Sequence, residues 1–365
     1  MSKIGLPNID IVFVQKAVSA IDRSERGVLC LCVLDSHANA EAVKHVYKYE
    51  TDIKATDYDD DNLAAIKRAF LVAVNKVYVI SAPTGSDFSV FTPVLEGMKY
   101  NYVSVLAKAM QTELANYIVT KNANSPGKKY VALVANVTVA DSKYIINLKG
   151  DWVQEVGASG HTDMIQYLPR LASVLCNLPM NRSITYYELE DLEDVDSSFV
   201  TTEHDLNYWT NEGYLLLFMD EDVIKVGRGV NSLTTFTSTD SEDMRKIIIV
   251  ESMNIIIEDI YNTFKEYYIG KYKNSYDNQV LFISAVNAYF RQLQREEILD
   301  PNYDNHAEVD VELQRDAWLA IGKTEAEDWN TETVKDMTFK SYVYLAGSVK
   351  ILDAIEDLKF TISMA

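Results

Sequence analysis

The sequence predicts an α/β fold with about two domains. Its 365 residues exceed the roughly 100–200 residues of a typical single domain. Residues 26–35 (RGVLCLCVLD) are continuously apolar in their middle, which is typical of a central strand covered on both faces. Helix-spaced apolar residues follow at 63–73, and a second strand-like run lies at 76–81 (KVYVIS). This alternation of strand and helix indicates α/β architecture.

The remaining elements follow from the same periodicities. In the first half, we expect a strand at 9–15, a helix at 106–119, a strand at 129–137 and a helix at 161–176, which must kink or start near Pro169. The helix at 63–73 begins behind an acidic run, Asp57 to Asp61, which suits a helix N-terminus. In the second half, the expected elements are a strand at 181–189, a short helix at 206–212, a hairpin at 213–219 and 223–226, long helices at 242–268 (N-capped by Ser241) and 275–296, and strands at 308–312, 338–345 and 358–363.

Charge and cysteine content restrict the class of protein. The 54 acidic and 34 basic residues give a formal charge of -20, which disfavours nucleic-acid and anionic-membrane partners. Three cysteines cannot all pair within one chain, which suits a reducing cytosol, and we expect synthesis and assembly in the cytoplasm. The longest apolar run, Val28 to Leu34, is far shorter than the ~20 residues that cross a bilayer. The 23 tyrosines suit protein contacts or half-buried surfaces.

Two fragments imitate ligand-binding motifs, and neither has the required pattern. Gly322-Lys323-Thr324 ends like a phosphate-binding loop, but Ala317 stands where that loop needs its first glycine. Asp57, Asp59 and Asp61 have the spacing of an EF-hand, but Asn62 occupies its glycine position and Arg68 replaces its glutamate. A solvated acidic helix cap is the favoured interpretation of the aspartates.

Catalytic and metal patterns are also absent from the sequence. The run at 157–161 (GASGH) resembles a nucleophile elbow, but His161 stands where the second glycine belongs. The five histidines lie at positions 37, 45, 161, 204 and 306 without metal spacing, and Cys30 and Cys32 lie in an apolar run. We therefore predict no catalytic residue, no metal site and no cofactor, and a protein that is not an enzyme.

Several separated segments resemble the contractile tail sheath family of phage tails and phage-tail-like bacteriocins. They are the N-terminal GLPNIDIVFVQKAVSAIDRSERGVLCL, LPMNRSITYYEL at 178–189, VGRGVNSLTTFTSTD at 226–240, YIGKYKN at 268–274 with AVNAYFRQLQREEILD at 285–300, and the ending AGSVKILDAIEDLKFTI. The resemblance reaches both termini and much of the interior. Compared with many sheath proteins, this chain lacks large outer insertions.

The resemblance implies a structural subunit that polymerises as stacked hexameric rings around an inner tube and contracts to drive the tube through a cell envelope. It implies an N-terminal arm at 1–16, an outer α/β domain at 17–240, an α+β inner domain at 241–356 with a long helical hairpin, and a C-terminal arm strand at 357–365. The implied partners are further copies of the chain, the inner tail tube protein, and baseplate and tail terminator proteins. The subunit would be part of a released phage tail or bacteriocin particle.

Three sets of residues are candidates for roles in such an assembly. The arms have alternating apolar faces that suit strand exchange between subunits; these residues are Ile9, Ile11, Phe13, Leu358, Phe360 and Ile362. Exposed basic residues of the predicted helical hairpin are tube-facing candidates; these are Lys265, Lys271, Lys273, Arg291 and Arg295. Arg228, Gly229 and Asn231 predict a structural turn that joins two domains.

Two alternatives stay open at this stage. A type VI secretion sheath component has the same mechanics but needs a dedicated partner sheath chain. An α/β enzyme whose catalytic residues come from distant loops belongs to a different class, and turnover or a persistent monomer would favour it.

Overall fold

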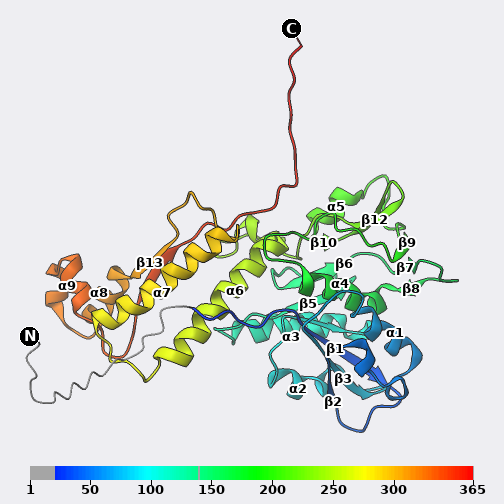
Figure 1. Cartoon of the computed structure of the whole chain (residues 1–365), viewed down its shortest axis with the longest axis horizontal. Coiled ribbons are helices and arrows are strands. Elements are labelled where there is room, and N and C mark those ends of the chain that lie inside the picture. Colours follow the sequence, from blue (N-terminus) through cyan, green and yellow to red (C-terminus); the bar gives the residue numbers. More distant parts are fainter. Residues whose placement is uncertain (1–20, 139, 365) are drawn as a thin grey trace, which may run out of the picture. The chain divides into compact units, whose positions relative to one another are not determined.

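The computed structural model describes residues 21–138 and 140–364. The chain forms two compact units, shown in Figure 1 by their labelled elements. The larger unit contains Arg23–Asn262, Glu296–Asp300 and the segment from Ile351 onward. The smaller unit contains Thr263–Arg295 and Pro301–Lys350. The sequence also predicts a boundary between an outer and an inner sheath domain at position 240. These domains are defined by their positions in an assembled particle, so this boundary stays a prediction.

A seven-stranded sheet forms the centre of the larger unit. In spatial order its strands are β10 (Tyr214–Leu215), β6 (Ile145–Leu148), β5 (Val131–Ala135), β4 (Tyr102–Val105), β1 (Val28–Asp35), β3 (Lys76–Pro83) and β2 (Val43–Tyr47). All neighbouring strands are parallel except β2, which pairs antiparallel with β3. The chain passes from β1 to β3 on one side and then crosses to β4 on the other. The α/β fold class is therefore confirmed.

Helices cover both faces of this sheet, which explains the unbroken apolar character of β1. Leu29 and Leu31 face one core, with α1 (Asp60–Arg68) and α4 (Met164–Asn177) packed on it. Cys30 and Cys32 face the other core, with α2 (Thr92–Glu96) and α3 (Gln111–Ala123). Pro169 lies inside α4, whose N-cap Asp163 accepts a hydrogen bond from the backbone N–H of Ile165.

Smaller sheets complete the larger unit, together with α5 (Leu206–Asn211) and α6 (Ile247–Thr263). One sheet has the order β8 (Thr162–Asp163), β7 (Trp152–Glu155) and β9 (Leu192–Val195). The hairpin that the sequence predicts is present as β11 (Leu217–Asp220) and β12 (Val223–Val226). The expected strand at 181–189 is wrong: this segment makes turns around Tyr186, whose φ of 58° leaves the extended region, and only Glu188 forms a β-bridge, to Lys225.

The smaller unit is built on α7 (Tyr276–Arg295), which follows a π-helical turn at Phe264–Tyr268. Its other elements are β13 (His306–Val309), α8 (Val311–Ala320), α9 (Thr331–Asp336) and β14 (Leu345–Ser348). Inside it, the buried side chain of Gln314 on α8 donates to the carbonyl of Val334 on α9 at 2.6 Å. The expected strand at 308–312 ends at Val309 because Asp310 becomes the N-cap of α8.

Candidate functional site

The root of the C-terminal segment is held by a buried carboxylate. The side chain of Glu356 is 5% exposed, whereas its neighbour Ile355 is 100% exposed and Leu358 is 89% exposed. Polar contacts, rather than apolar packing, therefore fix this end of the chain to the larger unit.

Three side chains from separate parts of the larger unit contact the Glu356 carboxylate. Thr185 donates its hydroxyl to Oε1 at 2.5 Å. Arg228 places Nη1 3.4 Å from Oε2, and the ammonium of Lys246 pairs with the same oxygen. We call Glu356 with these three partners the carboxylate clasp.

Two flanking aspartates add exposed ion pairs to the clasp. Asp357 accepts from Arg228 Nη2 at 2.7 Å, although its side chain is 76% exposed. This hydrogen bond lowers the pKa of Asp357 and raises the pKa of Arg228. Asp353 lies 3.6 Å from Lys246 Nζ. The segment before the arm thus uses its acidic residues as attachment points.

The loop after β12 brings the two cations of the clasp together. The backbone N–H of Asn231 donates to the carbonyl of Arg245 at 2.8 Å, and Ile247 donates back to Gly229 at 3.0 Å. The side chain of Asn231, 1% exposed, donates to the carbonyl of Met244 at 2.7 Å and accepts from the N–H of Leu233 at 3.1 Å. These bonds place the start of α6, and with it Lys246, beside Arg228.

Gly229 allows the loop to approach the Thr185 segment closely. A Cβ atom at Gly229 would lie 3.0–3.1 Å from side-chain atoms of Ile184, Ser183 and Thr185. The N–H of Gly229 instead donates to Thr185 Oγ1 at 2.8 Å, so this hydroxyl keeps its proton for Glu356. The structure therefore brings Arg228 and Gly229 to the clasp. The role of the turn in joining two domains stays a prediction.

Beyond the clasp, the C-terminal segment offers an apolar face to solvent. Leu358, Phe360 and Ile362 are 89%, 75% and 72% exposed, and residues 358–364 form no strand within the described chain. Figure 1 draws this segment as an extended red trace. The corresponding N-terminal residues, Ile9, Ile11 and Phe13, lie outside the described residues. The role of these six residues as inter-subunit arms stays a prediction.

The five tube-facing candidates are all exposed, but they form two separate groups. Lys265, Lys271 and Lys273 precede α7, while Arg291 and Arg295 lie four residues apart in its last two turns. At 1.5 Å per residue, the 18 positions from Lys273 to Arg291 correspond to about 27 Å, whereas Lys265 lies in the π-helical turn that packs against Phe282 in the middle of α7. Any contact with a tube would therefore be divided between two basic groups, and the tube-facing role of these residues stays a prediction.

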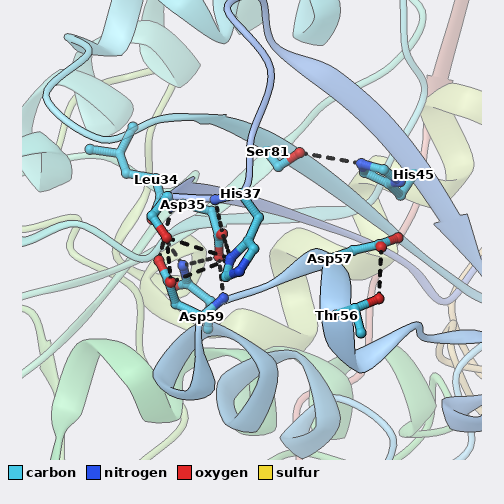
Figure 2. Close-up of polar contacts among 10 residues, drawn as sticks. Leu34, Asp35, His37, His45, Thr56, Asp57, Asp59 and Ser81 are labelled. Carbon is cyan, nitrogen blue, oxygen red and sulfur yellow. Dashed lines mark hydrogen bonds and ion pairs between the residues drawn. The ribbon is translucent and has the colours of Figure 1, made fainter.

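A second polar cluster lies at the carboxyl end of β1, where ligands bind in many open α/β sheets. Figure 2 shows Asp35, the last residue of β1, with His37 and Asp59 beside it. The Nδ1 atom of His37 lies 3.1 Å from Asp35 Oδ1 and 3.4 Å from Asp59 Oδ1. Three possible metal-ligand atoms, one from each residue, lie within 4.8 Å of one another. Sequence spacing missed this cluster because Asp59 comes from a segment more than twenty residues away.

Internal hydrogen bonds occupy the carboxylates of this cluster. Asp35 Oδ2 accepts from Asn62 Nδ2 at 2.8 Å and from the N–H of Asp59 at 2.9 Å, and Oδ1 accepts from the N–H of His37 at 2.9 Å. Burial opposes ionisation of Asp35, but these bonds outweigh it and hold its pKa below the usual value. Because the Asp35 oxygens already accept hydrogen bonds, this cluster is better suited to hold the loop after β1 against α1 than to bind a ligand.

No helix in the described part of the chain is long and apolar enough to cross a membrane. The described part of the chain combines an α/β body with an exposed, extended C-terminal segment.

Comparisons with known protein sequences give two matches. Residues 239–365 match the family model of the phage tail sheath C-terminal domain. The chain is 29% identical to a tail sheath protein of Clostridium phage phiCD119, over 99% of both chains.

Solved structures show the same fold. The anti-feeding prophage helical sheath in its contracted state is 13% identical, with a TM-score of 0.72 over 99% of each chain. A sheath tail protein from Desulfitobacterium hafniense is 15% identical, with a TM-score of 0.68 over 83% of this chain and 94% of that one. These similarities confirm the predicted resemblance to the contractile tail sheath family.

Proposed function

We propose that copies of this chain stack as hexameric rings around an inner tube, and that contraction of the stack drives the tube through a target cell envelope. The observation that carries the proposal is the C-terminal segment, which presents Leu358, Phe360 and Ile362 to solvent in strand-like alternation. An apolar strand without a partner is an aggregation hazard unless another chain covers it. In a sheath, a second copy of this chain would cover the strand.

Burial of the arm gives a joint of useful strength. Fully burying one large aliphatic or aromatic side chain contributes about 1.5–3 kcal/mol. Three such residues contribute about 5–9 kcal/mol before the entropy of ordering the arm is subtracted. Backbone hydrogen bonds of an added strand fix its register at the same time.

The two-stranded sheet of the smaller unit is suited to accept an arm from a neighbouring subunit. The outer edge of β13 is already occupied, because the Asn287 side chain exchanges hydrogen bonds with the backbone of Ala307 at 2.7 and 3.0 Å. Among described residues, the outer edge of β14 has no backbone partner. Since a two-stranded sheet is marginal alone, an added strand would stabilise it.

Electron microscopy of the purified full-length chain tests the proposal. We expect hollow striated tubes from the wild type. Replacing Phe360 and Ile362 by serine should abolish the tubes and leave the thermal melt of the monomer unchanged, because both side chains are exposed. The matched control replaces Lys359 and Thr361 by serine on the opposite face, and it should still form tubes. Equal assembly by both double variants would contradict the proposed arm.

The proposed partners are the inner tail tube, the baseplate and a tail terminator, with assembly in the bacterial cytoplasm before release in a phage tail or bacteriocin particle. The exposed basic groups before α7 and at its end would meet the tube. The family similarity and the exposure of these residues support this placement.

A type VI secretion sheath component is the second candidate, because it shares the same mechanics. Assembly of the purified chain alone separates the two candidates, since a type VI component needs a dedicated partner chain. A monomer that persists at high concentration and turns over a substrate would instead support the α/β enzyme alternative.

A further inference from the structure

We infer that Glu356 is a positioning residue that fixes the direction in which the C-terminal arm leaves the subunit, through the carboxylate clasp. This inference rests on the proposed function, in which the arm joins one subunit to another. The clasp itself is a property of the single chain and can be measured without assembly.

The clasp is the last attachment of the chain before the exposed arm. Upstream, Leu352 donates its N–H to the carbonyl of Ile298 at 3.0 Å, and Ile351 forms a β-bridge with Leu299. Beyond Asp357, the described residues up to position 364 make no hydrogen bond or ion pair with the rest of the described chain, and their side chains are exposed. The direction of the arm is therefore set between residues 353 and 357.

Glu356 dominates this anchorage because it is the buried member. Its side chain is 5% exposed and contacts three groups, whereas that of Asp357 is 76% exposed and contacts Arg228 alone. Exposed ion pairs contribute little because water and salt screen them. Removing one partner of a buried pair leaves an uncompensated charge. Neutralising Glu356 should therefore loosen the root of the arm far more than neutralising Asp357.

A strained turn at Tyr186 holds the Thr185 side of the clasp in place. Tyr186, next to Thr185, adopts a φ of 58°, which is rare for a bulky residue. Hydrogen bonds from its N–H to the carbonyls of Val226 and Gly227, at 2.9 and 3.3 Å, stabilise this conformation. The surrounding structure thus enforces the strain, and it aims the Thr185 hydroxyl at Glu356.

The clasp fixes the arm root without using apolar packing. Ile355 and Leu358, on either side of Glu356 and Asp357, stay exposed, so polar contacts alone set the direction of the arm at this point.

Distance measurement between two spin labels tests the inference on the monomeric fraction of the full chain. One label is placed at Thr361→Cys on the arm and the other at Asn116→Cys on an exposed position of α3, in a Cys176→Ser background. We expect Glu356→Gln to widen the distance distribution at least twofold, while Asp357→Asn leaves it close to that of the wild type. Lys246→Gln, which removes a cation of the clasp, is a second variant in case Glu356→Gln does not fold.

The outcomes separate the clasp from the proposed function. A wild-type distribution that is unchanged by Glu356→Gln or Lys246→Gln would overturn the inference, even if the wild type forms tubes. Equal widening by Asp357→Asn would also overturn it, because the buried residue would then have no special role. A widened distribution in the Glu356 variant supports the clasp, even if the wild type forms no tubes and the proposed function fails.

Discussion

Replacing Lys128 by methionine should strongly destabilise the larger unit. Lys128 lies just before β5, and its Nζ contacts Glu258 Oε2 on α6 at 2.6 Å. Both side chains are 8% exposed. Burial lowers the pKa of Lys128, although the nearby carboxylate opposes that shift. This ion pair therefore connects α6 to the sheet in a place with little access to water.

The structure sets the expected magnitude. Lys128→Met leaves the Glu258 carboxylate buried without its partner, which costs about 3–5 kcal/mol of unfolding free energy. The double variant Lys128→Met with Glu258→Leu removes both charges and keeps similar volume, so it should recover most of this loss. Lys67 and Glu50 give a matched exposed pair, 3.7 Å apart with side chains 46% and 52% exposed. Lys67→Met should therefore cost only about 0–1 kcal/mol.

Urea unfolding of the four proteins, followed by far-UV circular dichroism, measures these differences. The reasoning is refuted if Lys128→Met costs no more than Lys67→Met. It is also refuted if the double variant loses as much as Lys128→Met alone, because the cost would then not come from the unpaired Glu258 carboxylate.

Further predictions concern the turn, the β1 cluster and the basic groups. Gly229→Ala should cost about 1–3 kcal/mol in urea unfolding, because its Cβ would crowd three side chains. Asn231→Ala should cost a similar amount by leaving the buried N–H of Leu233 and the partly buried carbonyl of Met244 unpaired. Asp35 has a lowered pKa in the folded protein, so the stability that its carboxylate contributes is complete above its unfolded pKa of about 3.9. This stability is lost as the pH falls through the lower folded pKa. The difference in unfolding free energy between wild type and Asp35→Asn should therefore be smaller at pH 3 than at pH 6. Reversing the charges of Lys271 and Lys273 should weaken assembly on a tube without changing the thermal melt of the monomer.

Sequence periodicity predicted the α/β body well where burial is simple. The strand β1 and the helix α4 form as predicted because neighbouring elements cover their apolar side chains on the expected faces. The segment 181–189 has the alternation of a strand, yet it turns at Tyr186 because the N–H groups there bond to carbonyls at the end of β12. Tertiary hydrogen bonding decided this conformation, and local pattern contains no information about it.

The candidate site was less accessible to sequence reasoning because long-range contacts build it. Glu356 is 171 residues from Thr185 and 110 residues from Lys246. The motif around Arg228 and Gly229 indicated a tight turn but gave no sign of an acidic partner 129 residues away at Asp357. A signal was present in the segment 353–357, where three acidic residues precede the apolar face of the arm.

The two parts of the C-terminal segment use different physical interactions for different tasks. Residues 353–357 attach to their own subunit through carboxylates, whereas residues 358–362 keep their apolar side chains exposed. If the arm root were apolar, it would compete with the arm for the same kind of surface, and the segment could fold back on its own subunit. Charge at the root and apolar character beyond it remove that competition. In the proposed assembly, the order of residues in DAIEDLKFTI would therefore specify which part stays with its own subunit and which part joins another.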